Sequence, residues 1–168
     1  TASDGGGPLA LRSLKLDGCM SLAGNVAFFR SLTKLKHLSL SLCYDLEGDV
    51  AEFSVLPMLE ELNLFHCYKL TGDVSSLAHL VHLKQLNLNW CSKLRGDAVV
   101  ALTQPCLRQL EELHLSGCYE LTGNVEGLAS LVQLKKLDLQ ACCKLRGDVG
   151  VLTTSLDKLT YLDLMECP

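Results

Sequence analysis

Leucine alternates with polar residues along this chain in one recurring pattern, L-x-x-L-x-L-x-x-C. The pattern begins at Leu11, Leu35, Leu59, Leu83, Leu110, Leu134 and Leu159. Successive starts are 24, 24, 24, 27, 24 and 25 residues apart. Such a period predicts a stack of similar units, in which each unit covers the apolar face of its neighbour.

The first half of each unit predicts a short strand. In the third copy, residues 61–65 alternate between outward polar positions and inward Leu62 and Leu64, which is typical of a half-buried strand. Strands from successive units should pair in parallel, about 4.8 Å apart.

The second half carries an L-x-G-[DN]-[VA] tail in six copies. Gly72 should end the extended run, and the Asp73 carboxylate should cap a following turn by accepting free amides. Val74, Leu77 and Leu80 then recur every third residue, a period that favours a short 3₁₀ helix over a long α-helix. The fourth copy has three extra residues and predicts an α-helix of about two turns that ends near Pro105.

The units resemble leucine-rich repeats, whose signature is L-x-x-L-x-L-x-x-[NC]-x-L. The resemblance implies an α/β fold: a solenoid with a curved parallel sheet on its concave face and short 3₁₀ or helical turns on its convex face. The repeat domain would cover residues 11–168, with six full repeats and a truncated seventh. Residues 1–10 include a Gly-Gly-Gly-Pro run and suggest a linker or a cloning remnant.

The resemblance extends to two subclasses. The tail is similar to the L-[ST]-G-x-[IV]-P of plant-specific repeats without its proline, and Cys in place of Asn is similar to the cysteine-containing repeats of F-box adaptors. The repeats also resemble, more weakly, those of ROCO-type proteins. No G-x-x-x-x-G-K-[ST] motif is present, so no nucleotide chemistry can be placed here.

Seven of the nine cysteines occupy one repeat position, which predicts buried structural thiols in the interior of the stack. The resemblance implies that they bond to backbone between turns. Neither C-x-x-C nor N-x-[ST] occurs, which favours a reducing compartment, and we expect a cytoplasmic protein.

Composition narrows the function classes. The 168 residues carry a net charge of −4 with both signs interspersed, which argues against nucleic acid as a partner. The apolar runs are too short to span a bilayer, so no membrane partner is expected. His114 and Ser116 face out from one strand without an oxyanion donor loop, and no deep pocket is expected. We therefore expect neither an enzyme nor a cofactor or metal.

The outward strand positions form columns along the stack, and their side chains vary as a recognition surface would. Candidate ligand contacts in these columns are Leu42, Asn63, Phe65, His66, Asn87, Asn89, Trp90, His114, Asp138 and Asp163. Exposed aromatics are enriched at binding hot spots, although Phe65 and Trp90 are also suited to packing on Tyr44 and Tyr68. Adjacent Asp138 and Asp163 suggest either a contact with a cation or basic ligand, or two solvated carboxylates.

These features predict a protein-interaction module whose concave face binds a polypeptide. Two narrower hypotheses are a substrate-receptor segment of an F-box ubiquitin-ligase adaptor and an immune-receptor recognition fragment. The seventh copy stops directly after a strand, and we also expect end-to-end self-association through this uncapped repeat.

Overall fold

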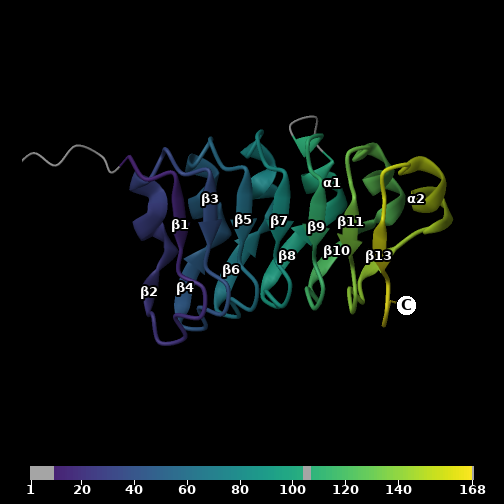
Figure 1. The fold of residues 1–168 in the computed structure, drawn as a ribbon. Coiled ribbons are helices and arrows are strands. Elements are labelled where there is room, and N and C mark those ends of the chain that lie inside the picture. Colours follow the sequence, from purple (N-terminus) through teal and green to yellow (C-terminus); the bar gives the residue numbers. More distant parts are fainter. Residues whose placement is uncertain (1–9, 104–106, 168) are drawn as a thin grey trace, which may run out of the picture.

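Each of the first six repeats forms one turn of a coil made of a strand, a second strand and a short helix, and the seventh contributes one strand among the described residues. The computed structural model describes residues 10–103 and 107–167, so the linker prediction for residues 1–9 lies outside the described residues. The repeats follow one another from left to right in Figure 1. This arrangement confirms the predicted stack.

The first strands of the described repeats form one parallel sheet in chain order. They are β1 (Ser13–Lys15), β3 (His37–Ser39), β5 (Glu61–Asn63), β7 (Gln85–Asn87), β9 (Glu112–His114), β11 (Lys136–Asp138) and β13 (Tyr161–Asp163). Pairing aligns Asn63 with Asn87, Asn87 with His114, and Asp138 with both His114 and Asp163. The predicted central column is therefore confirmed. We call the outer surface of this sheet, on the side predicted to be concave, the strand face.

A second parallel sheet, which the repeat pattern did not predict, is formed by the L-x-G-D tails. Its strands are β2 (Gly24–Asn25), β4 (Leu46–Asp49), β6 (Leu70–Asp73), β8 (Leu94–Asp97), β10 (Leu121–Asn124) and β12 (Leu145–Arg146). The expectation that Gly72 ends the extended run is wrong, because Gly72 lies inside β6 at φ +112°. A Cβ on Gly72 would collide with the Asp49 carboxylate of the preceding repeat. The missing side chain thus lets adjacent tails approach closely.

Short helices complete most turns. The 3₁₀ helices are η1 (Val26–Ser31), η2 (Val50–Val55), η3 (Val74–His79) and η5 (Val125–Ser130), and the α-helices are α1 (Ala98–Leu102) and α2 (Gly150–Ser155). The predicted 3₁₀ turns and the Asp73 cap are confirmed, since Asp73 Oδ1 accepts the Ser75 amide at 2.8 Å. The fourth repeat forms an α-helix as predicted, but its five residues fall short of two turns, and Pro105 lies outside the described residues.

The core contains ladders of leucine and cysteine with almost no exposure. Each buried thiol donates to a leucine carbonyl one repeat earlier, as Cys67 does to Leu40 at 3.1 Å and Cys91 does to Leu64 at 3.0 Å. Burial raises the pKa of Cys67 to about 12. The bonds from these buried thiols to leucine carbonyls confirm that they are structural groups bonded to backbone between turns.

Thiol labelling should distinguish the buried cysteines of the core from the exposed cysteines. In the native protein near pH 8, Cys19 and Cys143 are exposed and should react with a maleimide or aromatic disulfide. Cys91 and Cys118 should stay unmodified, because burial raises their pKa and excludes the reagent. Peptide mapping by mass spectrometry reads out each site, and guanidinium-unfolded protein, in which every thiol reacts, is the control. Equal labelling rates at Cys91 and Cys143 would contradict the ladder.

Candidate functional site

Just after each strand of the first sheet, the chain turns through one residue with a left-handed backbone. The φ values at this position are 75° at Gly18, 61° at Leu42, 60° at His66, 63° at Trp90, 69° at Gly117, 56° at Ala141 and 58° at Glu166. These residues were expected to continue the outward strand columns, but the structure places them in the turn. A left-handed backbone costs about 1–2 kcal/mol for a residue with a side chain. Such strain in bulky residues is typical of functional sites.

The aromatic side chains at these turns form a continuous row. We call Tyr44, Phe65, His66, Tyr68, Trp90 and Tyr119 the aromatic ridge. The rings of His66 and Trp90 stack with centroids 5.7 Å apart, and those of Tyr44 and Tyr68 stack at 5.4 Å. Phe65 meets the His66 ring edge-on at 4.1 Å, and Tyr119 meets Trp90 edge-on at 6.1 Å.

Tyr119 was not among the predicted site residues. The signal was present, because Tyr119 follows its repeat's cysteine just as Tyr44 and Tyr68 do. His66 also contacts Tyr68, whose hydroxyl hydrogen-bonds with Nδ1 of the imidazole. Burial lowers the pKa of His66.

Trp90 packs against both neighbouring repeats and is still partly exposed. Its ring lies over Gly117, where a Cβ would come within 2.7 Å of the indole Cε3 atom. The indole is half-buried, while Tyr68 and Tyr119 are each 38% exposed. The sequence left two alternative roles for these aromatic residues, packing on their neighbours and contact with a ligand. Because the rings are partly covered and partly exposed, they can serve both roles. Leu42 is half-buried and occupies the same turn position one repeat before His66.

The polar candidates have a backbone role that the sequence did not reveal. Asn63, Asn87, Asp138 and Asp163 each accept the amide two residues later through Oδ1, at 2.9–3.1 Å. This amide has left the strand ladder, and the side-chain oxygen satisfies it. The geometry fixes Oδ1 of Asn63 and Asn87 toward the amide, and their NH₂ groups have no acceptor among the described residues.

A hydrogen-bonded cluster joins repeats 4 to 6. Asn89 accepts the Ser116 amide at 2.7 Å and donates to Asp138 Oδ2 at 2.9 Å. His114 Nδ1 lies 3.8 Å from the same Asp138 oxygen. Asp138 and Asp163 are neighbours as expected, but Asp138 is only 9% exposed and both of its oxygens are engaged. Among residues 10–103 and 107–167, no group of three or more His, Cys, Asp or Glu side chains could hold a metal ion.

The strand face has a small hollow of about 90 Å³ at repeats 3 to 5. Glu61, Asn63, Gln85, Asn87, Glu112 and His114 line it, above the backbone of Leu62 and Leu86. It brings together three of the predicted residues, Asn63, Asn87 and His114. No nucleophile lines it, so it does not supply the groups for covalent catalysis.

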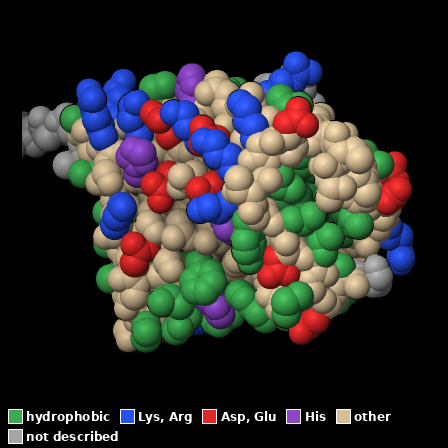
Figure 2. All heavy atoms as spheres, turned by 45° about the vertical axis from the view of Figure 1, so that its right-hand side comes forward, with side chains coloured by type: hydrophobic (Ala, Val, Ile, Leu, Met, Phe, Trp, Pro, Cys, Tyr) green, Lys and Arg blue, Asp and Glu red, His purple; other side chains and the backbone are tan. Residues whose placement is uncertain are grey.

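Charged side chains gather at the end of the strands opposite the aromatic ridge, and we call this region the charged margin. Lys36 and Lys84 both contact the Glu60 carboxylate, at 2.6 and 2.9 Å, and Lys135 contacts Glu111 at 2.6 Å. Figure 2 shows charged side chains gathered on the upper part of the surface and hydrophobic ones along its lower margin. Hydrogen bonds from Lys36 and Lys84 lower the pKa of Glu60 to about 2.

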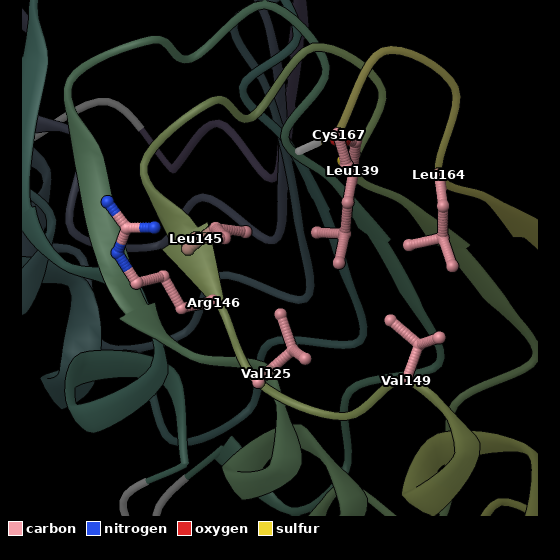
Figure 3. Close-up of a pocket in the computed structure, with 8 residues that line it drawn as sticks. Val125, Leu139, Leu145, Arg146, Val149, Leu164 and Cys167 are labelled. Atoms are coloured by element: carbon pink, nitrogen blue, oxygen red, sulfur yellow. The ribbon is translucent and has the colours of Figure 1, made fainter.

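A larger pocket of about 220 Å³ lies at the last repeats (Figure 3). Its lining is mostly aliphatic, and the side chains of Leu139, Leu164 and Val149 point toward one another. Arg146 is its charged member, and its guanidinium extends away from these side chains. The pocket thus offers apolar surface without converging polar groups. In the described part of the chain, no helix is long and apolar enough to cross a bilayer.

Most turns of this coil contain a strand with buried leucines, a second strand formed by the L-x-G-D tail, and a short helix. This combination defines a class of protein. The chain folds as a leucine-rich-repeat solenoid. No protein-family model matches the chain, and no curated protein matches it.

Three solved structures illustrate the likeness. An internalin C2 from Listeria monocytogenes has 19% identity and a TM-score of 0.59, over 92% of this chain and 71% of that one. The Arabidopsis receptor kinase HAESA, in complex with the peptide hormone IDA and the co-receptor SERK1, has 22% identity and a TM-score of 0.63. A plant ice-binding protein has 22% identity and a TM-score of 0.64. Each alignment to the two plant proteins covers 92% of this chain, but only 29% of the receptor kinase and 56% of the ice-binding protein. At these identities, the likeness shows the fold.

Gly117→Ala tests the seat of Trp90. The new Cβ would meet the indole and would also require a strained φ of +69°. We expect a loss of about 1–2 kcal/mol from backbone strain, a further loss from the collision, and a red shift of Trp90 emission as the ring moves outward. Urea unfolding and fluorescence are the measurements.

Gly18→Ala is the matched control, since φ is +75° there but nothing lies within 4 Å of the added Cβ. Equal destabilisation by both substitutions, with unchanged emission, would mean that Gly117 does not seat the indole.

The Glu60→Gln substitution tests how much the ion pairs of the charged margin stabilise the protein at different pH values. Because the folded pKa of Glu60 is about 2, below its ordinary value of 4.5, its ion pairs stabilise the protein above pH 4.5. This contribution should disappear as the pH falls from 4.5 toward 2. Urea unfolding at several pH values should therefore show a difference between wild type and Glu60→Gln that shrinks in acid. Glu47→Gln, a site without an ion pair among the described residues, is the control and should show a smaller dependence.

Proposed function

We propose that this solenoid is a protein-interaction module and that its strand face and aromatic ridge bind a polypeptide. The observation that carries the proposal is the ridge itself. Leu42, His66 and Trp90 adopt left-handed backbones at positions where Gly18 and Gly117 stand in other repeats. Bulky side chains kept at such positions, and partly exposed, suit ligand contact better than they suit stability.

The surroundings of the ridge also support a polypeptide ligand. The free NH₂ groups of Asn63 and Asn87 lie on the strand face beside Phe65 and can donate to backbone carbonyls of a ligand. Aromatic anchors next to amide donors are typical of peptide-binding surfaces. Among the similar structures, the HAESA complex contains a peptide hormone, which supports the same class of ligand for this chain.

The two narrower hypotheses concern the partner rather than the surface. A substrate receptor of a ubiquitin-ligase adaptor and an immune-receptor fragment would both use the outward columns. An F-box in the parent sequence would favour the first, whereas allelic variation concentrated at outward positions would favour the second. End-to-end self-association and a cytoplasmic location likewise stay predictions, and sedimentation at increasing concentration tests the first of these.

Panning a displayed random-peptide library on the protein tests the proposed function. We expect selected peptides whose affinity falls by about tenfold or more in the Phe65→Ala, His66→Ala, Trp90→Ala variant, because hot-spot aromatics contribute about 2 kcal/mol or more each. Interferometry with immobilised peptide gives the Kd, and circular dichroism confirms that the variant is folded.

Phe28→Ala is the matched control, since Phe28 is 82% exposed on η1, away from the strand face. Affinity that drops equally in Phe28→Ala, or a triple variant that binds as wild type does, would refute the site. A library that yields no binder would refute the proposed function.

A further inference from the structure

We propose that the bound polypeptide is an extended segment with a basic residue, which enters the hollow between Glu61 and Glu112 while a neighbouring apolar residue lies on the aromatic ridge. This inference rests on the proposed function and names the chemistry of its partner.

The hollow has the size and position for a cationic head group. Its volume of about 90 Å³ leaves room for a small cationic head group. Glu61 of β5 and Glu112 of β9 flank Gln85 of β7 in register. The backbones of these two glutamates are therefore about 9.6 Å apart along the stack, at roughly 4.8 Å per strand, one on each side of the hollow.

The polar groups of the hollow favour a donor-rich ligand. Glu61 uses Oε2 for His37 at 3.2 Å, and no partner is seen for Oε1 among the described residues. Glu112 meets Lys136 through Oε1 at 3.1 Å and His114 through Oε2 at 3.6 Å. The Glu61 and Glu112 side chains are 30% and 24% exposed, so a guanidinium can reach their carboxylates. Charged hydrogen bonds of this kind are stronger than neutral ones.

The charge of the whole strand face points to the same ligand. Its three outward columns carry five carboxylates, at Asp17, Glu61, Glu112, Asp138 and Asp163, and two ammonium groups, at Lys15 and Lys136. An acidic segment would be repelled by this surface, whereas a basic one is complementary to it. The ligand side chains that reach repeats 3 to 7 should therefore carry positive rather than negative charge.

The distance between hollow and ridge sets the ligand motif. Asn87 lines the hollow and is three residues from Trp90. Because pairing with the next repeat continues up to the Trp90 amide, this separation corresponds to about 10 Å at roughly 3.3 Å per residue. An extended ligand covers this distance in about three residues. The basic residue and its apolar neighbour should therefore be about three positions apart.

The test pans a displayed random decapeptide library on the whole chain and on the Glu61→Gln, Glu112→Gln variant. We expect wild type to select Arg or Lys about three positions from an aromatic or aliphatic residue. The double variant should lose the basic preference and keep the apolar one. A synthetic peptide from the wild-type selection should bind the double variant at least about tenfold more weakly, with a shallower dependence on salt.

Glu111→Gln is the matched control, because Glu111 pairs with Lys135 on the charged margin and does not line the hollow. Peptides without a basic preference would overturn this inference, as would a basic preference that the double variant retains. In both cases, sensitivity of those peptides to the triple ridge variant would leave the proposed function standing. A selection without any binder would overturn both.

Discussion

Hydrogen bonds between successive turns determine where every side chain of this solenoid lies. The pairing continues three residues beyond the strands, since the left-handed residues also donate to the next repeat, as His66 does to Asn89 at 2.9 Å and Trp90 does to Ser116 at 2.6 Å. A shift by one residue would move the leucines to the surface. The same bonds that bury the leucine ladder therefore hold the aromatic rings at stacking distance.

The sequence predicts the periodic part of this structure well. Leucine spacing gave the strand columns, and Val74, Leu77 and Leu80 gave the 3₁₀ turn, because burial imposes these periods directly. The second sheet escaped prediction because Leu70–Asp73 is too short to alternate and contains a glycine that usually interrupts strands. The left-handed turn was also missed, although Gly18 and Gly117 share its column, because Leu42, His66 and Trp90 are unusual there.

Some residues of the candidate site only face outward, whereas others also form hydrogen bonds within the protein. Asn63 and Asn87 were predicted from their outward position, and the structure adds that each satisfies a backbone amide. Asp138 was predicted either to contact a cation or basic ligand or to be a solvated carboxylate, yet the Gln140 amide of its own repeat and Asn89 of repeat 4 engage its two oxygens. Pattern alone identifies the face on which a side chain lies. Its unused donors and acceptors depend both on the turn that follows, as at Asn63 and Asn87, and on contacts between repeats, as at Asn89, which the pattern does not encode.

The bond from Asn89 to Asp138 connects residues 49 positions apart and passes over repeat 5. In a solenoid, each repeat usually contacts only its nearest neighbours, so fraying can proceed one unit at a time. Because of this second-neighbour bond, unfolding of repeat 6 also breaks a partly buried hydrogen bond between repeat 4 and the Asp138 carboxylate. Repeats 4 to 6 thus form a cooperative block within an otherwise linear array, and the hollow with its two carboxylates overlaps that block rather than a fraying end.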